Sequence, residues 1–335
     1  MNDVALGAGK LPPPLLNRLL RWRGAPDARV LVGPRCGIDA AVVAVGRHRV
    51  ILKSDPVTFT TERIGWYAVQ VNANDVAVLG GRPRWFQPTI LVPPRTRSST
   101  VMRIARDIHH ACRALGVSVT GGHTEVTDAV TRPVVTGDMQ GLLLRARAIT
   151  SDGARPGDVV LLTKAAAIEG TAILCHERTR ALPRSLISAG RRLRERPGIS
   201  VVKDAEIAAR HGVSAMHDPT EGGIRAALHE VAFASRVRLD VDLDRIPVLP
   251  PTEAVCRHYG IDPLGLIGSG ALLATVRPSR APSLLRAWAR HGISGQIIGS
   301  VVSGRSVHAV RAGRPVAFPW VARDEIITAL GRHRS

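Results

Sequence analysis

The sequence predicts an α+β fold in two domains, and three observations carry this prediction. The chain has 335 residues, a length typical of two domains or one large one. Strand and hairpin patterns alternate with helical patterns, which favours α+β domains over a doubly wound parallel sheet. A turn-rich stretch, TSDGARPGD, begins at residue 150. We therefore predict an N-terminal domain over 1–150 and a C-terminal α/β domain over 151–335.

The elements of the first half follow from apolar spacing and from the residues that interrupt it. LPPPLLNRLLRW predicts a helix, because prolines are tolerated in a first helical turn. A helix over 62–79 is closed by Gly80, Gly81 and Pro83. AAVVAV and RVILKSD flank a Gly-Arg-His turn and predict a hairpin. Further elements are a strand in WFQPTILVPP, an amphipathic helix in STVMRIARDIHHACRALG, a short strand in GVSVT and one or two strands in PVVTGDMQGLLLRARAI.

Helix and strand patterns continue to alternate through the second half. Aromatic residues make up only 3% of the chain, so we expect an aliphatic core. The predicted helices cover 203–211, 223–234 and 282–291. The predicted strands are VSAMH, VRLDVDL, ALLATV and two near 296–302 and 306–310.

Composition narrows the classes of function. The four cysteines are far apart and form no CxxC, which argues against a disulfide framework or a structural zinc site and fits a reducing cytoplasm. No apolar run is long enough to span a membrane, and the N-terminus lacks a signal-peptide pattern. We therefore expect a cytoplasmic protein that does not contact a membrane.

The formal net charge of +19 first suggests nucleic acid as a partner. However, the arginines are scattered, with one dense cluster, RRLRER, at 191–196. Aromatic residues that could stack on bases are few. We interpret the charge as solvated helix faces on a surface that favours anionic ligands such as nucleotides, and nucleic-acid association remains a minor hypothesis.

Carboxylates in apolar surroundings form the first candidate site. Asp39, Asp55, Asp75, Asp138 and Asp218 all lie beside residues that favour burial. A buried ionised carboxylate is costly unless it is hydrogen-bonded, paired or bound to a cation. Several carboxylates gathered at strand and helix ends would suit Mg²⁺, which prefers oxygen ligands and often bridges to phosphates. Asp39 and Asp55 are equally well explained as turn residues.

Asn74 and Asp75 interrupt an apolar helix in VNANDVAVLGG. Both residue types are poor helix formers. A structural polar contact would explain them, but we favour a ligand role.

The stretch DPTEGG has a structural and a functional interpretation. Asp218 can be an N-cap, with Pro219 at the first helical position and Glu221 as a capping-box partner. Gly222 and Gly223 would then lie in the first turns, at a cost of up to about 1 kcal/mol each. Such glycines suggest that something approaches the backbone closely, and a helix N-terminus suits phosphate.

GGHTEV, at 121–126, is either a metal site or a phosphate-binding loop. His123 and Glu125 have the residue types of metal ligands, whereas Gly121 and Gly122 would let the backbone close on a phosphate. A His-x-Glu pair also begins the zinc deaminase signature, which needs a CxxC that is absent here. Because the aspartates already supply ligands for Mg²⁺, we interpret the loop as a phosphate-binding loop at one side of an ATP site. Glu125 could equally be a structural partner for an arginine.

The order of these motifs resembles a known superfamily. It comprises aminoimidazole ribonucleotide (AIR) synthetase, selenophosphate synthetase, thiamine-monophosphate kinase and the hydrogenase maturation factor HypE. The matching motifs, in order, are GIDAAVV, KSDPVTF, VNANDVAVLGGRP, GGHTEV, GDVVLLTK, EGTAIL and HDPTEGG. The resemblance spans almost the whole chain, and HDPTEGG and EGTAIL are most similar to the HypE-like branch.

The resemblance implies a homodimer in which two N-terminal domains form a shared β-barrel, with a C-terminal α/β sandwich packed against it. ATP and Mg²⁺ would lie in a cleft between the domains. The chemistry of the family is phosphoryl transfer to a carbonyl or analogous oxygen, which needs mainly positioning and charge neutralisation. Neither GAGK at 7–10 nor GLIGSG at 265–270 matches a common nucleotide-binding motif.

The resemblance also assigns residues by motif. The implied metal and phosphate carboxylates are Asp39, Asp55, Asp75 and Asp218, with Asn74 supporting Asp75. The implied phosphate loop is Gly121, Gly122, His123 and Thr124. Lys10 resembles a lysine in the mobile N-terminal segment of selenophosphate synthetases and would reach the transferred phosphoryl group. We therefore expect catalytic roles for Lys10, Asp75 and His123.

Several motifs depart from the family pattern. Gly37-Ile38-Asp39-Ala40 has one acid where many members have two, which leaves the metal stoichiometry open. HypE ends in a Pro-Arg-x-Cys tail, whereas this sequence ends LGRHRS, so we expect that the HypE reaction does not transfer unchanged. The absence of a cysteine near Lys10 counts against selenophosphate synthesis. The segment after Asp55 lacks the histidine-containing stretch of thiamine-monophosphate kinase.

Two hypotheses follow. The first is a HypE-like, ATP- and Mg²⁺-dependent enzyme that activates an amide- or carboxylate-like oxygen of a small-molecule or protein-borne acceptor, in hydrogenase or metallocentre maturation. The alternative is a non-catalytic ATP-binding partner or scaffold in maturation, suggested by Ile38 and the different tail. The acceptor itself is not predicted.

Overall fold

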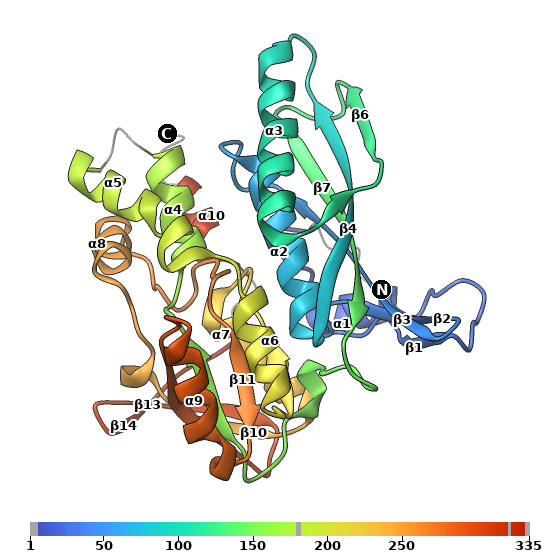
Figure 1. Ribbon diagram of the computed structural model, residues 1–335. Coiled ribbons are helices and arrows are strands. Elements are labelled where there is room, and N and C mark those ends of the chain that lie inside the picture. The colour runs from blue at the N-terminus through green and yellow to red at the C-terminus, as the bar shows by residue number, and fades with distance from the viewer. Residues whose placement is uncertain (1–5, 179–181, 321–322, 332–335) are drawn as a thin grey trace.

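A computed structural model describes residues 6–178, 182–320 and 323–331 (Figure 1). The fold is a mixed α/β fold with two sheets, one built from strands within 30–143 and the other from strands within 159–316. The last four residues of the LGRHRS ending lie outside the described residues. None of the helices in the described ranges combines the length and apolarity that crossing a membrane requires.

The first sheet has the strand order β1-β2-β3-β7-β4-β5, and β6 also pairs with β4. Its strands are β1 (Val30–Val32), β2 (Ala41–Val45), β3 (His48–Val57), β4 (Gly81–Val92), β5 (Ser118–Val119), β6 (His123–Val126) and β7 (Val134–Leu143). The predicted hairpin is confirmed, because β2 and β3 pair antiparallel with Val45 opposite His48. Buried and more exposed residues alternate along β7, the pattern of a sheet with one face in the core.

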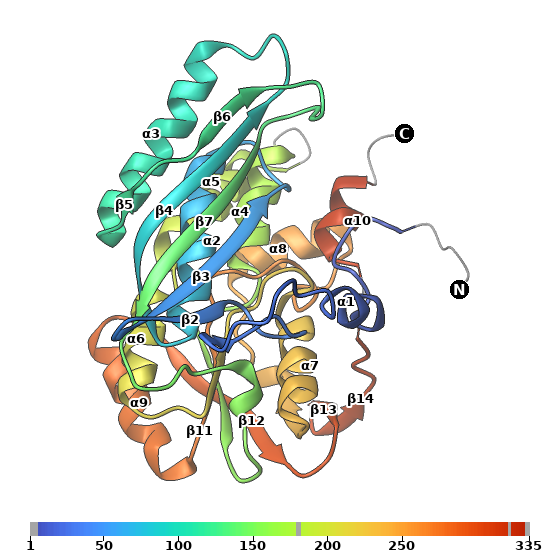
Figure 2. The same cartoon turned by 90° about the vertical axis from the view of Figure 1, so that its right-hand side faces the viewer.

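Two helices cover one face of this sheet, and Figure 2 shows the opposite face. Both helices, α2 (Ile64–Val78) and α3 (Ser98–Leu115), were expected from the sequence. Nearly every residue of α2 is buried, as expected for a helix that is apolar all round. It packs against the first sheet on one side and against α6 (Val202–Arg210) of the second half on the other. Its polar residues are therefore held inside the molecule, between the two halves.

The second sheet is mixed, with the order β14-β13-β10-β12-β8-β11-β9. Its strands are β8 (Val159–Thr163), β9 (Ala215–His217), β10 (Arg238–Asp242), β11 (Leu273–Val276), β12 (Gly295–Val302), β13 (Ser306–Arg311) and β14 (Arg314–Val316). The remaining helices are α1 (Pro13–Leu19), α4 (Ile168–Glu177), α5 (Arg184–Arg192), α7 (Gly223–Ser235), α8 (Pro250–Tyr259), α9 (Ala281–Arg290) and α10 (Glu325–Gly331). The short edge strand β9 ends at His217, so the residues that follow it lie at the margin of the sheet facing the first half.

The structure corrects the prediction for DPTEGG. Helix α7 begins only at Gly223, so Asp218 is not its N-cap and Pro219 is not its first residue. Gly222 and Gly223 have positive φ angles of 79° and 59°. A β-carbon at Gly223 would lie 2.7 Å from the carbonyl oxygen of Leu264, so the close neighbour of this backbone is another segment of the chain. The sharp entry into α7, rather than a ligand, requires these glycines.

Candidate active site

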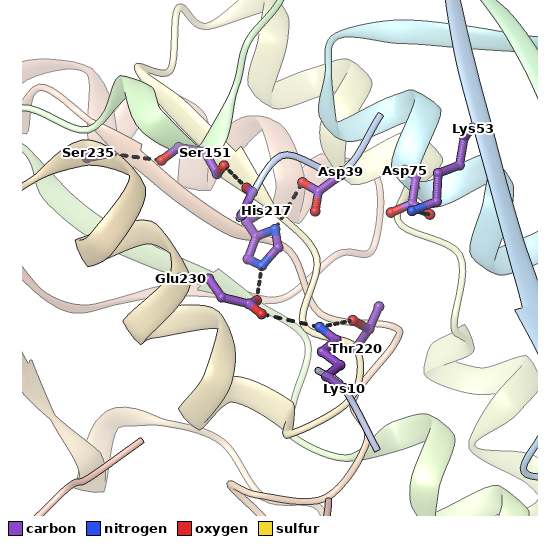
Figure 3. A network of polar contacts seen from close by, with 10 residues as sticks. Lys10, Asp39, Lys53, Asp75, Ser151, His217, Thr220, Glu230 and Ser235 are labelled. Atoms are coloured by element: carbon purple, nitrogen blue, oxygen red, sulfur yellow. Dashed lines mark hydrogen bonds and ion pairs between the residues drawn. The ribbon is translucent and has the colours of Figure 1, made fainter. Parts of the chain in front are cut away.

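A cavity of about 760 Å³ lies between the two halves of the molecule. Its lining comes from the N-terminal segment, from β3 and α2 of the first half, and from the loop and helix that follow β9. Figure 3 shows how side chains distant in the sequence converge there. The cavity lining includes Lys10, Asp39, Asp55 and Asp75 of the predicted set. We call this cavity the cleft.

His217 is the centre of the largest polar network in the cleft (Figure 3). Its Nδ1 lies 2.9 Å from Asp39 Oδ2, and its Nε2 lies 2.7 Å from Glu230 Oε2. Burial lowers the pKa of His217, but the charges and hydrogen bonds of Asp39 and Glu230 outweigh burial and raise it well above its ordinary value. Since a carboxylate only accepts, both ring nitrogens must donate, and the ring is an imidazolium. His217 therefore fixes two carboxylates and has no free nitrogen for a metal.

Two further hydrogen bonds fix the loop that carries Asp39. Ser151 donates through its hydroxyl group to the carbonyl of Gly37, and Ser235 Oγ donates to the carbonyl of Ser151 at 2.8 Å. Ser235 ends α7, the helix that also presents Glu230. The position of Asp39 is thus set by the same helix that sets the other end of the histidine bridge.

Lys10 reaches the cleft from the N-terminal segment. Its Nζ donates to Thr220 Oγ1 at 3.2 Å and lies 3.3 Å from Glu230 Oε1. Burial raises the pKa of Glu230, but Lys10 and His217 outweigh it and lower the value to about 2. Glu230 is therefore ionised, and it links the lysine to the histidine network.

Lys53 supplies a second positive charge, from the first half of the molecule. Its Nζ lies 3.1 Å from Asp55 Oδ1 and 3.2 Å from Asp75 Oδ2. Burial raises the pKa of Asp75, and the attraction of Lys53 opposes that rise without cancelling it. The side chain of Asn72 brackets the backbone of Asp55, accepting from its amide at 2.9 Å and donating to its carbonyl at 3.2 Å.

Asp218 is the carboxylate whose bonding capacity is unused. Both of its oxygens are buried, and neither has a hydrogen-bond partner from another residue in the described ranges. Burial, followed by the charge of Asp39, raises the pKa of Asp218 to about 7. Ligand atoms of Asp39, His217 and Asp218 lie within 4.8 Å of one another. Because the histidine is already bonded on both sides, the two aspartates are the donors that fit a hard cation such as Mg²⁺.

Asn74 lies elsewhere, at the junction of the two halves. Its Nδ2 donates to the carbonyl of Ile199 at 2.9 Å, and its Oδ1 accepts from the amide of Val201 at 2.8 Å. Both partners precede α6. These contacts favour the structural interpretation of Asn74, since both its amide nitrogen and its amide oxygen are hydrogen-bonded within the chain.

The GGHTEV stretch also lies outside the cleft of its own chain. His123 and Thr124 are on β6, which runs parallel to β4 at the exposed end of the first sheet (Figure 1). His123 is exposed and lies 3.4 Å from Glu125. Gly122 has φ of 139°, and a β-carbon there would collide with the carbonyl of Pro88. Tight packing on β4 thus explains this glycine without a phosphate.

The sequence analysis missed several polar residues of the cleft. Lys53, His217 and Glu230 were not singled out, although Lys53 and His217 begin the matching motifs KSDPVTF and HDPTEGG. A lysine inside the apolar run VILKSD was a usable signal, because a cation at a strand position that favours burial needs a partner. Glu230 gave none, since an acid on a helix is ordinarily solvated.

Comparisons with known proteins match both halves of the chain to one family. Residues 37–143 match the family described as AIR synthase related protein, N-terminal domain, and residues 155–311 match the corresponding C-terminal domain. Carbamoyl dehydratase HypE of Rhizobium leguminosarum bv. viciae is 30% identical over 285 residues, which cover 80% of this chain and 78% of the relative.

Two similar solved structures share the fold. A hydrogenase maturation protein HypE in complex with ATP has a TM-score of 0.70 and 23% identity, covering 92% of this chain and 90% of that one. A chain of the HypE–HypF complex has a TM-score of 0.72 and 21% identity, covering 85% of this chain and 94% of that one.

Proposed function

Since the chain belongs to the AIR synthase-related family and has HypE among its relatives, we propose that it is an ATP- and Mg²⁺-dependent enzyme of the HypE-like type. It phosphorylates, and so activates, an amide- or carboxylate-like oxygen of an acceptor. The observation that carries this proposal is the pair of unpartnered oxygens on Asp218 beside Asp39. A solved HypE structure with bound ATP supports the choice of nucleotide.

The carboxylates have distinct roles in this proposal. Asp39 and Asp218 would hold Mg²⁺, and Asp55 and Asp75 would supply the second pair of carboxylates for metal and phosphate. Bound Mg²⁺ supplies charge neutralisation for phosphate oxygens. Asp75 also keeps Lys53 charged and in place, since burial alone would lower the pKa of that lysine.

The two lysines serve the phosphoryl group. Lys53 is fixed by two aspartates, so it offers a positioned charge to phosphate oxygens. Lys10 is held through its side-chain tip by Thr220 and Glu230, and it would exchange these partners for a phosphoryl oxygen. Fixed cations aimed at a transferring phosphoryl group are the main catalytic contribution in this chemistry.

The phosphate loop requires a second copy of the chain. We propose a homodimer in which the first sheets form the shared β-barrel and Gly121, Gly122, His123 and Thr124 face the cleft of the partner subunit. Residues 121–124 are not among the lining residues of the cleft in their own chain, and β6 pairs with β4 in the first sheet, which supports this arrangement. His123 would then donate to nucleotide phosphate, and the C-terminal domain would form the α/β sandwich.

The physiological setting we propose is hydrogenase or metallocentre maturation. The relative from Rhizobium leguminosarum is named carbamoyl dehydratase HypE, and a related chain forms a complex with HypF. We therefore propose a maturation partner protein as the source of the acceptor.

Steady-state ATP turnover tests the assignment. We expect turnover that requires Mg²⁺ and that falls about 100-fold or more in Asp75→Ala, the loss typical when a positioned electrostatic group is removed. Asp27→Ala is the matched control, because the Asp27 side chain is exposed and pairs with Arg29, at 2.7 Å between Oδ2 and Nη2. Turnover in Asp75→Ala equal to that in Asp27→Ala would contradict the assignment of this site, whereas no turnover in the unmodified protein would favour the non-catalytic alternative.

A further inference from the structure

Five arginines surround a second cavity at the junction between the two halves. Arg145 and Arg147 follow β7, Arg155 precedes β8, and Arg277 and Arg280 follow β11. The cavity has a volume of about 360 Å³ and shares no lining residue with the cleft. We call it the arginine cavity.

Positive charge exceeds negative charge in the arginine cavity, whose described lining has five arginines and one carboxylate, Asp158. Within the described ranges, none of the five guanidinium groups forms an ion pair. Arg145 donates to the carbonyl of Ala209, and Arg280 Nη1 lies 3.5 Å from the carbonyl of Gly212. Such contacts orient a guanidinium group but leave its charge in place.

The one carboxylate among the described lining residues, that of Asp158, accepts hydrogen bonds from groups of its own half. Asp158 Oδ2 accepts from the amide of Arg155 at 3.1 Å and from Ser214 Oγ at 2.5 Å. Asp158 is buried, whereas the five arginines are exposed. Nearby guanidinium groups without acidic partners repel one another, and an anion between them would remove that repulsion.

We propose that the arginine cavity binds a small ligand that carries two or more phosphate groups. Guanidinium groups match phosphate oxygens in bidentate pairs, and the volume is at the lower end of the range of small-molecule sites. Single-stranded nucleic acid would call for aromatic stacking surfaces, and no aromatic residue lines this cavity. The inference does not rest on the proposed ATP chemistry.

A ligand in the arginine cavity would contact both the connection between the halves and the second half of the molecule. Arg145 and Arg147 lie on the connection between the halves, which is fixed to the first half where the amide of Ile149 donates to the carbonyl of Leu79 at 3.0 Å. Arg277 and Arg280 belong to the second half. A bound polyphosphate would therefore tie the connection to the second half and stabilise the folded chain by mass action.

Calorimetric titration with pyrophosphate, at low salt and with EDTA present, tests this site. We expect binding that weakens about tenfold or more in Arg147→Gln/Arg277→Gln, since two charge-assisted contacts are lost. Arg49→Gln/Arg311→Gln is the control, because it removes the same charge from exposed strand positions elsewhere. Arg147→Lys/Arg277→Lys keeps the charge and should weaken binding less, which separates lost contacts from failure to fold.

A cleft variant, Lys10→Met/Lys53→Met, should bind pyrophosphate as the unmodified protein does. Loss of the signal in that variant would show that the heat arises in the cleft, and the proposal would fail. If the Arg49→Gln/Arg311→Gln control weakened pyrophosphate binding equally, the loss of affinity would come from the change in net charge, and the proposal would fail. If duplex DNA displaced pyrophosphate at a concentration below that of pyrophosphate, nucleic acid would be the preferred ligand of the cavity. That result would also overturn the proposal.

Discussion

At the scale of single residues, burial explains which site positions the sequence could indicate. Asp39, Asp55, Asp75 and Asp218 were predicted because an acid among apolar neighbours needs a partner, and the structure brings all four to one region between the halves. The partners were harder to predict. His217 is the last residue of a short apolar strand, but its two bonds reach Asp39, 178 residues away, and Glu230, 13 residues away.

Glu169, in the EGTAIL motif, gives a prediction at this scale. It is 4% exposed, and Ser269 donates its amide to Glu169 Oε2 at 3.2 Å. Burial raises the pKa of Glu169 to about 7 from an ordinary value of 4.5. The folded state therefore holds a proton that the unfolded chain releases, so the contribution of Glu169 to stability decreases as pH rises from about 4.5 to about 7.

We expect Glu169→Gln to flatten this part of the pH dependence, because glutamine can still accept from the Ser269 amide. The variant should be more stable than the unmodified protein at pH 8, by up to about 3 kcal/mol, and the difference should shrink towards pH 4.5. Urea denaturation at a series of pH values measures it. Parallel stability curves for the two proteins would contradict the assignment of a neutral Glu169.

At the scale of elements, periodicity predicted the strands and helices that have one buried face. The predicted helix over 203–211 corresponds to α6, and the strands of the hairpin were placed within a few residues. Helix α4 was missed because most of its residues are buried, which leaves no polar face to reveal its period. Strand β6 was missed because all four residues are exposed and only pairing with β4 makes them a strand.

Asn74 tests how α2 is joined to the second half. Its side chain makes two buried hydrogen bonds, to Ile199 and Val201, so Asn74→Ala leaves two backbone groups unsatisfied. We expect a loss of about 2–4 kcal/mol in the free energy of unfolding, measured by urea denaturation. A variant of unchanged stability but weakened ATP binding would restore the predicted ligand role and contradict the structural one.

At the scale of the whole molecule, the sequence indicated two halves with a site between them. It did not indicate which subunit of a dimer contributes each group of site residues. The motifs were expected to converge on one ATP and Mg²⁺ site between the domains. Four aspartates and Lys10 do so, whereas residues 121–124 lie on the far part of the first sheet. The order of motifs in a sequence carries no information about contacts between two subunits. The position of residues 121–124 outside the cleft of their own chain could therefore not be predicted from the motifs.

The proposed dimer predicts complementation between two inactive variants. A site built from Asp218 of one subunit and His123 of the other fails in both the Asp218→Asn and the His123→Ala homodimer. After mixed refolding, half of the dimers should be heterodimers, each with one intact site. We therefore expect ATP turnover to recover to about a quarter of the unmodified level, in a closed two-fold dimer. Recovery absent from a mixture verified to contain heterodimers would place the loop outside the site.

The central claim is that buried aspartates bind Mg²⁺ together with ATP, and calorimetric titration with a non-hydrolysable ATP analogue tests it most directly. We predict tight binding with Mg²⁺, at least about tenfold weaker binding with EDTA, and the same weak binding in Asp218→Asn whether or not Mg²⁺ is present. Affinity that is unaffected by both EDTA and Asp218→Asn would contradict the account.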